Sequence, residues 1–349
     1  MQKLRLLLYP FSLIYGLLVM LRNKLYDLGF FKSNQFDLPI IVVGNLEVGG
    51  AGKTPMIEYL VRLLADKKKV ATLSRGYGRK TSGFILASKE STSSQIGDEP
   101  KQLNVKFKDI SVAVSENRVK GIEQLKNDHQ VILLDDAFQH RRVKAGLTVL
   151  LIDYHRVFEP WVLLPAGNLR EPKSGMKRAD IIVVTKAPKI FSPLDQRIIE
   201  NRIRPFPGQQ IYYSYINYAE LELLDSNSSE SWVLSAINKK TQIVLLTGIA
   251  KTGPLIDFLE QYSKNITHLE FGDHHRFTKG DIEKLSDAYS AIPGGNKLII
   301  TTEKDAMRLQ EPQLQNEIIN LPIHYLPIRA EICDRFKRDF DKLILDYVG

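Results

Sequence analysis

The stretch that decides the fold is Val43-Gly-Asn-Leu-Glu-Val-Gly-Gly-Ala-Gly-Lys-Thr-Pro55. The apolar residues 40–43 predict a buried strand that runs into it, and residues 56–66 predict a helix that follows it. A glycine-rich turn that ends in Gly52-Lys53-Thr54, between a strand and a helix, is typical of a phosphate-binding loop. We therefore expect a nucleotide-binding α/β domain built around this turn.

The glycines of this loop let backbone N–H groups turn toward phosphate oxygens, and the start of the following helix adds partial positive charge. Lys53 is expected to reach the β- and γ-phosphates of ATP, and the hydroxyl of Thr54 to ligate Mg²⁺. The usual pattern has a glycine where this chain has Glu47, and we expect the paired Gly49-Gly50 to supply the flexibility. The predicted phosphate-binding residues are Glu47, Val48, Gly49, Gly50, Ala51, Gly52, Lys53 and Thr54.

Residues 131–136, Val-Ile-Leu-Leu-Asp-Asp, predict a buried strand that ends in two carboxylates. Two adjacent carboxylates beside a triphosphate are unfavourable without a cation, so we expect them to hold Mg²⁺ directly or through water. The sequence leaves open whether Asp135 or Asp136 contacts the metal. Residues 185–188, Thr-Lys-Ala-Pro, lack the aspartate that closes a guanine-binding element, and ATP is therefore favoured over GTP.

Short apolar runs alternate with helical stretches through the first part of the chain, which predicts a parallel sheet covered on both faces. These runs are residues 39–43, 70–74, 110–114, 131–135, 148–153 and 180–185. Residues 211–218 alternate between apolar and polar, and a polar turn at 225–230 followed by residues 231–234 predicts a hairpin between two domains. A second α/β set begins at residue 242 and continues through residues 268–271, 297–302 and 323–326.

The composition is that of a soluble globular protein, with 44% hydrophobic and 25% charged residues among 349. That length suits two domains. The formal charge of +8 favours acidic partners, but basic clusters interleaved with base-stacking aromatic residues are not evident, so we expect no nucleic-acid partner. The single cysteine, Cys333, excludes an intramolecular disulfide framework and a cysteine-based zinc cluster.

Near the N-terminus, residues 10–28 predict a helix that begins at Pro10 and stops at Gly29. Its uncharged part, residues 10–21, is too short to span a bilayer. One side carries an apolar stripe, which fits either a helix packed on the core or a helix that lies in a membrane surface with basic flanks. The stripe consists of Phe11, Ile14, Leu18, Leu21, Leu25 and Leu28.

Taken together, several motifs in this chain resemble the tetraacyldisaccharide 4′-kinase family, the lipid A 4′-kinases of Gram-negative bacteria. They cover nearly the whole chain in order. Two departures are small: Ala137 stands where the family usually has glycine, and residues 247–253 form a loose version of its second-domain loop. Beside the phosphate loop, the motifs are Leu73-Ser-Arg-Gly-Tyr-Gly-Arg, Gly97-Asp-Glu-Pro, Asp135-Asp-Ala-Phe-Gln-His-Arg-Arg, Leu164-Pro-Ala-Gly-Asn-Leu-Arg-Glu-Pro, Arg178-Ala-Asp, Asp273-His-His-Arg-Phe and Thr302-Glu-Lys-Asp-Ala.

The resemblance implies transfer of the γ-phosphoryl group of ATP to the 4′-hydroxyl of an acylated glucosamine disaccharide that carries a 1-phosphate. It also implies a P-loop NTPase-like parallel-sheet domain, a second, smaller α/β domain and a two-stranded β-ribbon between them. We expect the membrane-associating helix in residues 1–30, the kinase domain in 31–210, the hairpin linker in 211–240 and the C-terminal domain in 241–349. The enzyme is expected to be a monomer bound peripherally to the cytoplasmic face of the inner membrane.

Phosphoryl transfer to an alcohol also needs a group that accepts the alcohol proton, and Asp98 is our candidate. By resemblance, His274 orients Asp98 and tunes its basicity, whereas the neighbouring His275 is not selected. Glu99 is expected in the outer shell of the metal. Arg118 is expected to neutralise the transferring phosphate.

Further polar side chains are candidates for contacts with the two substrates. Gln139 and His140 follow the metal carboxylates and are expected to contact the nucleotide or position the acceptor. Arg75, Tyr77 and Arg170 are expected to grip the lipid headgroup, since a guanidinium fork suits phosphate. The competing hypothesis is a membrane-associated P-loop ATPase that acts as a switch without phosphorylating an acceptor. That hypothesis leaves the Asp98 and His274 motifs unexplained.

Overall fold

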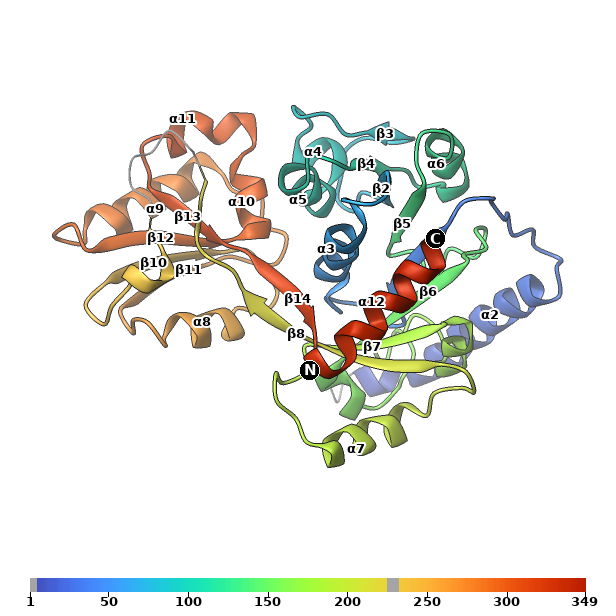
Figure 1. Cartoon of the computed structure of the whole chain (residues 1–349). Coiled ribbons are helices and arrows are strands. Elements are labelled where there is room, and N and C mark those ends of the chain that lie inside the picture. The colour runs from blue at the N-terminus through green and yellow to red at the C-terminus, as the bar shows by residue number, and fades with distance from the viewer. Residues whose placement is uncertain (1–4, 225–231) are drawn as a thin grey trace.

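The computed structural model describes residues 5–224 and 232–349. It contains two α/β lobes, and a long N-terminal helix lies beside the larger one (Figure 1). The larger lobe is built on a nine-stranded sheet with the order β14-β8-β7-β6-β1-β5-β2-β4-β3. The strands from β8 to β4 run parallel, and the edge strands β14 and β3 run antiparallel to their neighbours. The predicted α/β class is confirmed.

The strands of this sheet confirm the six apolar runs predicted from the sequence, include the predicted alternating strand 211–218 as β8, and add β3 and β14. Their central residues are buried because helices cover both faces, as a parallel sheet requires. The strands are β1 (Ile40–Asn45), β2 (Val70–Ser74), β3 (Ile85–Leu86), β4 (Ser111–Val114), β5 (Val131–Asp135), β6 (Leu147–Asp153), β7 (Ile181–Thr185), β8 (Gln210–Tyr218) and β14 (Ile328–Ile332).

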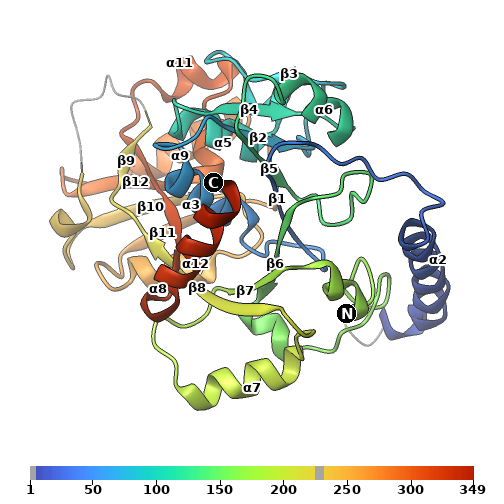
Figure 2. The same ribbon diagram turned by 45° about the vertical axis from the view of Figure 1, so that its right-hand side comes forward.

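The helices of the larger lobe are mostly short and lie on both sides of its sheet (Figure 2). On one face, α3 and α12 bury side chains in a common core with β1, β5 and β6. They are α2 (Tyr9–Asp27), α3 (Lys53–Leu64), α4 (Ser93–Ile96), α5 (Asp98–Lys106), α6 (Arg118–Leu125), α7 (Pro193–Ile203) and α12 (Asp334–Val348), with 3₁₀ turns η1 (Leu6–Leu8), η2 (Tyr154–Phe158) and η3 (Lys173–Arg178).

The smaller lobe has a five-stranded sheet with the order β11-β10-β12-β13-β9, in which only β9 is antiparallel. Two apolar clusters fill the spaces on its two faces. Its strands are β9 (Glu222–Leu223), β10 (Gln242–Thr247), β11 (Ile266–Glu270), β12 (Lys297–Thr302) and β13 (Ile323–Leu326). Its helices are α8 (Gly253–Leu259), α9 (Lys279–Ser290), α10 (Glu303–Leu309) and α11 (Gln315–Ile318), with η4 (Leu234–Ala236) and η5 (Pro312–Leu314).

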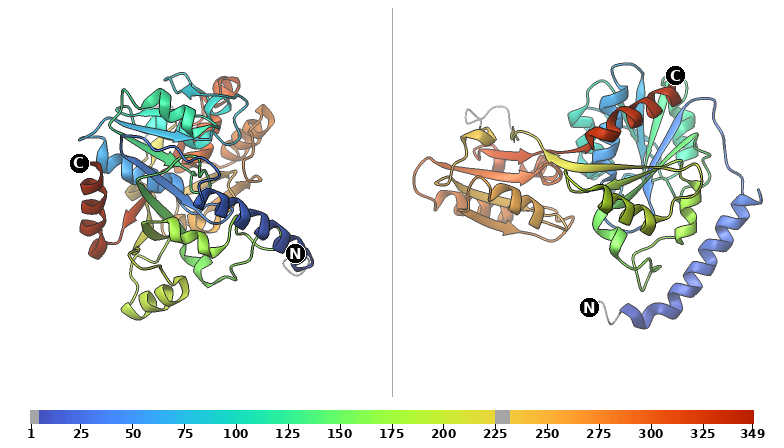
Figure 3. Two further views of the ribbon diagram at one scale, coloured as in Figure 1. Left: turned by 90° about the vertical axis from the view of Figure 1, so that its right-hand side faces the viewer. Right: turned by 60° about the horizontal axis from the view of Figure 1, so that its bottom comes forward.

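The connection between the lobes is a two-stranded ribbon, in which the predicted strand 211–218 has a different partner from the predicted one. Strand β8 pairs with β7 through residues 210–213 and with β14 through residues 214–218, so the described residues 232–234 are not its partner. The polar turn predicted at 225–230 lies outside the described residues. The ribbon of β8 and β14 runs from one lobe to the other (Figure 3, right).

The C-terminal segment returns to the larger lobe. On α12, Phe340, Ile344 and Val348 are buried in the same core as α3. This differs from the predicted range 241–349 for the second domain, because residues 328–349 belong by packing to the first sheet. The other predicted domain boundaries stay predictions.

The N-terminal helix α2 contacts the larger lobe through its small and polar side. The Ser12 hydroxyl bonds the carbonyl of Leu163 at 3.0 Å, and the Tyr15 hydroxyl bonds that of Arg170 at 2.7 Å. Its apolar stripe instead faces outward, with Phe11, Ile14 and Leu18 about 60% exposed. Packing on the core, one of the two possibilities left by the sequence, is therefore wrong for this stripe. No helix among the described residues is long and apolar enough to cross a bilayer.

Candidate active site

The predicted phosphate loop joins β1 to α3, and α3 begins at Lys53. Gly49 and Gly52 have φ values of +106° and +81°, in the left-handed region that favours glycine. Two groups at the end of β7 hold the loop: the Thr185 hydroxyl donates to the carbonyl of Ala51 at 2.9 Å, and Lys186 donates to the carbonyl of Gly50. The loop thus has the turn and the helix N-terminus that a phosphate requires.

The first part of the loop is tied to another segment. Glu47 pairs as an isolated bridge with Leu169, and its carboxylate lies 3.5 Å from Nε of Arg156. Burial raises the pKa of Glu47 although Arg156 opposes the shift. The N–H of Val48 donates to the carbonyl of Asn168 at 2.9 Å. In this structure Glu47 and Val48 therefore make protein contacts, and the free turn begins at Gly49.

The two predicted metal carboxylates lie beside the loop because β5 is the neighbour of β1, with Asp135 in register with Val43. Asp136 lies 3.6 Å from Nζ of Lys53 and 3.1 Å from Nη1 of Arg170. Burial acts to raise the pKa of Asp136, but Lys53 and Arg170 together bring it below its ordinary value. Arg170, a predicted headgroup residue, thus neutralises a carboxylate here.

Asp135 has a different environment. It is 3% exposed, and its Oδ1 has no hydrogen-bond partner among the residues the structure describes. Burial, with the nearby carboxylates Glu99 and Asp136, raises the pKa of Asp135 to about 7. A buried, unpartnered carboxylate oxygen beside a phosphate loop fits a cation ligand.

No group of three or more His, Cys, Asp or Glu side chains gathers as a metal site within residues 5–224 and 232–349. A magnesium ion between Asp135 and the Thr54 hydroxyl would complete its shell with phosphate oxygens and water, as Mg²⁺ prefers. Thr54 is buried in the first turn of α3. The residues present therefore fit a nucleotide-bound magnesium ion.

Arg118 is the first residue of α6 and contacts the backbone of Asp135. It is 3% exposed, and its guanidinium donates to the carbonyls of Ser115 at 2.9 Å and Asp135 at 3.3 Å. Burial lowers the pKa of Arg118 to about 10, although Asp135 and Asp136 act to raise it. The guanidinium of Arg118 thus binds the backbone at the end of β5, through the carbonyl of Asp135.

Gln139 and His140 follow in the same turn. The Gln139 amide donates to the carbonyl of Asn45 at 2.8 Å and to Glu171 at 3.0 Å, so it braces the start of the loop. Burial lowers the pKa of His140 to about 4, helped by nearby arginines, and its Nε2 has no partner among the described residues. His140 is thus a neutral, half-buried side chain.

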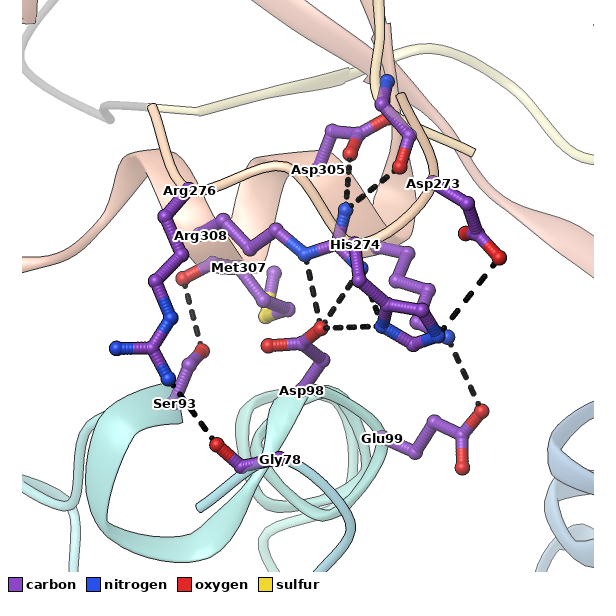
Figure 4. A network of polar contacts seen from close by, with 12 residues as sticks. Gly78, Ser93, Asp98, Glu99, Asp273, His274, Arg276, Asp305, Met307 and Arg308 are labelled. Carbon is purple, nitrogen blue, oxygen red and sulfur yellow. Dashed lines mark hydrogen bonds and ion pairs between the residues drawn. The ribbon is translucent and has the colours of Figure 1, made fainter. Parts of the chain in front are cut away.

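The proposed general base, Asp98, and its predicted partner, His274, lie near each other across the two lobes (Figure 4). Asp98 begins α5 in the larger lobe, and His274 lies in the loop after β11 in the smaller lobe. Nδ1 of His274 is 3.7 Å from Oδ2 of Asp98, which is longer than a hydrogen bond. Between them stands Arg308 from α10, which donates to Asp98 through Nε at 2.8 Å.

The remaining predicted residues lie around this pair. Glu99 meets Lys304 of the smaller lobe at 3.2 Å. Arg75 is exposed, and Tyr77 is 76% exposed, with its ring centre 5.8 Å from that of His274. Arg75 and Tyr77 are thus open to a large ligand near the base, whereas Arg170 lies by the carboxylates.

A cavity of about 570 Å³ opens between the lobes beside the loop. Thr54 and Lys186 mark its phosphate-loop end, and its walls are mostly apolar. Those walls include Ile216 and Tyr218 of β8, Ile249 and Leu255 of the smaller lobe, and Leu326 and Ile328 near β14. Its volume and lining are those of a small-molecule site.

A family model described as tetraacyldisaccharide-1-P 4′-kinase, LpxK, matches residues 4–347. The chain belongs to this kinase family. A tetraacyldisaccharide 4′-kinase of Phocaeicola vulgatus is 46% identical over 98% of this chain and 94% of the relative, and one of Bacteroides fragilis is 48% identical over 98% and 92%. The crystal structure of LpxK from Aquifex aeolicus in complex with ATP is 30% identical, covers 99% of this chain and 100% of that chain, and superposes with a TM-score of 0.76.

These matches confirm the kinase predicted from the sequence motifs, and the switch ATPase is not favoured. The sequence analysis did not select Arg308 or Lys186. Lys186 stood in the quoted segment 185–188, where only the missing aspartate was considered. Arg308 lies just past the Thr302-Glu-Lys-Asp-Ala motif, and no local pattern connects it with Asp98, 210 residues away.

Proposed function

We propose that this chain transfers the γ-phosphoryl group of ATP, bound with Mg²⁺, to the 4′-hydroxyl of a tetraacyldisaccharide 1-phosphate. The observation that carries the proposal is the meeting of two half-sites. One lobe supplies the phosphate loop, the carboxylates and Asp98, and the other brings His274 and Arg308 to Asp98. A phosphate donor and a proton acceptor for an alcohol are thereby held in one site.

In this mechanism Lys53 leaves Asp136 for the β- and γ-phosphates, toward which α3 presents its N-terminal N–H groups. Asp135 and Thr54 would hold Mg²⁺, which would neutralise phosphate charge there. Asp98 accepts the proton of the 4′-hydroxyl as that oxygen forms its bond to the γ-phosphorus. The bond from the γ-phosphorus to the β–γ bridging oxygen breaks, and ADP leaves.

The adenosine group is proposed to lie in the cavity between the lobes. That cavity begins at Thr54, and apolar walls suit an aromatic base. The acceptor is proposed to approach from the opposite side, where Arg75 and Tyr77 are exposed near Asp98. Nucleotide and lipid would then reach the phosphate loop from different directions.

The membrane surface is proposed to bind α2. Its outward face is apolar, Arg5 precedes it, Arg22 and Lys24 lie in its last turns, and its inner side is bonded to residues 163–170. We place the enzyme on the cytoplasmic face of the inner membrane, where ATP is available. A monomer suffices for this proposal, since one chain supplies both half-sites.

A product assay tests the proposal. The full-length protein is incubated with γ-labelled ATP and a 1-phosphorylated tetraacyldisaccharide in mixed micelles, with and without Mg²⁺. We expect magnesium-dependent label on the lipid. Release of labelled phosphate without labelled lipid would reject the lipid-kinase function.

A further inference from the structure

We propose that Arg308 is a positioning residue for this reaction: from the smaller lobe it aims the carboxylate of Asp98 and sets the hydrogen-bonding role of His274. The inference rests on the proposed role of Asp98 as the base. It adds a residue that joins Asp98 and His274 into one unit and makes that unit depend on the docking of the two lobes.

The first observation is how Arg308 holds Asp98. Nε and Nη2 of its guanidinium lie 2.8 and 2.7 Å from the same oxygen, Oδ2. The other oxygen, Oδ1, accepts no hydrogen bond from any residue that the structure describes. The hydrogen bond from Nε and the ion pair with Nη2 hold Oδ2 in place, and Oδ1 is left to receive the proton of an alcohol.

The second observation concerns His274. Nη2 of Arg308 also lies 3.2 Å from Nδ1 of His274. Because a guanidinium can only donate, Nδ1 must accept, and the ring proton of the neutral imidazole is then on Nε2. Nε2 faces Asp273 at 3.9 Å. In this geometry His274 acts on Asp98 through Arg308 and has no direct hydrogen bond to it.

The third observation is that Arg308 is itself held firmly. Its side chain is 5% exposed, and Nη1 donates to Oδ1 of Asp305 and to the carbonyl of Gly248, both at 2.8 Å. Asp305 accepts from the N–H of Gly248 and the hydroxyl of Thr302. The same Gly248 carbonyl accepts the N–H of His274 at 3.1 Å. One backbone carbonyl therefore helps to position both the guanidinium of Arg308 and the backbone of His274 (Figure 4).

The consequence is a link between domain docking and chemistry. Asp98 is on α5 and Arg308 is on α10, so the carboxylate is aimed only while these helices are together. The backbone of His274 supports a functional role for this loop, because a φ of +60° is uncommon outside glycine and is tolerated where the surroundings enforce it.

The test uses Arg308→Lys, which keeps the charge but loses the fork, and Arg308→Ala. Lys106→Met is the matched control: Lys106 also joins α5 to α10, through Glu303 at 2.7 Å, and α5 to α3, through Glu58 at 2.8 Å, without touching Asp98. For each full-length variant we measure kcat, KM for both substrates, the dissociation constant of ATP and the melting temperature. Asp98→Ala is measured in parallel.

We expect Arg308→Lys to lower kcat by about 10-fold and Arg308→Ala by about 10²-fold, with ATP affinity within about twofold of wild type. Added guanidinium ion at millimolar concentration should restore part of the kcat of Arg308→Ala, which a purely structural defect would not allow. Lys106→Met should keep kcat within about threefold.

Three results would overturn the proposal. They are a wild-type kcat in Arg308→Lys, an equal loss of kcat in Arg308→Ala and Lys106→Met, and an absence of guanidinium rescue in a folded Arg308→Ala. If Arg308→Ala does not fold, Arg308→Lys decides. An inactive Asp98→Ala beside active Arg308 variants refutes this inference alone, whereas an active Asp98→Ala also removes the proposed base.

Discussion

At the scale of single residues, the contrast between Asp135 and Asp136 explains how two adjacent carboxylates coexist. Asp136 is balanced by Lys53 and Arg170, while Oδ1 of Asp135 is buried with no partner among the described residues. We infer that Asp135 is the direct ligand of Mg²⁺ and that Asp136 holds Lys53 until the triphosphate binds. The sequence could not separate these roles, because Arg170, which pairs with Asp136, comes from the connection between β6 and β7.

Lys53→Ala is expected to abolish phosphoryl transfer, because the variant lacks the ammonium at the start of α3 that contacts the β- and γ-phosphates. Asp98→Ala should lower kcat by at least about 10²-fold while ATP still binds. Initial rates and equilibrium nucleotide binding distinguish the two effects. Near-normal turnover in Asp98→Ala would remove that residue from proton transfer.

The buried cluster at the lobe interface predicts a pH effect on stability. Burial, together with Glu58, raises the pKa of Glu303 to about 7 although Lys106 acts to lower it. The unfolded chain releases this proton near the ordinary value of 4.5. The native state therefore holds an extra proton between about pH 4.5 and 7, and this contribution to stability is lost as the pH rises through about 7.

Glu303→Gln should remove this pH dependence, since the amide cannot ionise. Melting temperatures at pH 5.5 and pH 8 are compared for the variant and the wild type. We expect the difference between the two pH values to shrink by roughly a few degrees in the variant. An unchanged or larger difference would contradict the assigned ionisation.

A site residue could be predicted from the sequence where it belongs to a short, local sequence motif. The loop at 49–54 and Asp135 follow from strand, turn and helix patterns, and the structure places them side by side. The pairing of Asp98 with His274 came only from the family resemblance. Arg308 was not predicted, because its proximity to Asp98 arises from the docking of two lobes.

At the scale of elements, α2 shows that an apolar stripe alone does not tell whether that side of a helix faces the protein core or a membrane. The predicted helix 10–28 matches the observed Tyr9–Asp27 closely. Spacing cannot tell a core-facing stripe from a membrane-facing one, since both are amphipathic. The decision comes from Ser12 and Gly16, the buried residues, which let the helix approach residues 163–170 and turn the stripe outward.

The double substitution Ile14→Glu/Leu18→Glu should reduce binding to anionic lipid vesicles by at least about 10-fold, because two exposed apolar side chains are lost from the membrane face. The melting temperature should not fall, since neither side chain is buried. The matched control is Ile190→Glu/Leu194→Glu, which changes two exposed apolar residues near α7. Equal vesicle binding by wild type and the α2 variant would contradict the interfacial helix.

Helix α12 makes the opposite case, because its apolar side is buried. Phe340 is fully buried between Tyr59 and Tyr212, with ring centres 5.8 and 5.1 Å away. Phe340→Ala should lower the free energy of unfolding by about 3–5 kcal/mol. Urea denaturation measures the change, with the half-exposed Phe158→Ala as control. A loss below about 1 kcal/mol would argue against this docking.

At the scale of the whole molecule, two sheets share one ribbon, and the chain passes between the lobes twice. Strand β8 leaves the larger lobe and β14 returns to it, so the smaller lobe is an insertion between paired strands. The two α/β sets could be predicted because alternating strands and helices are local signals. The return of residues 328–349 could not, since the partner of β8 lies more than 100 residues further along the chain.

The central claim is that a triphosphate held at Lys53 faces the carboxylate of Asp98 inside the site formed by both lobes. The most direct measurement is a crystal structure of the full chain with Mg²⁺ and a non-hydrolysable ATP analogue. We predict Lys53 turned from Asp136 to the β- and γ-phosphates, the metal on Asp135 and Thr54, and Oδ1 of Asp98 facing the γ-phosphate. A triphosphate bound away from Gly49–Thr54, or a γ-phosphate separated from Asp98 by the body of either lobe, would contradict the account.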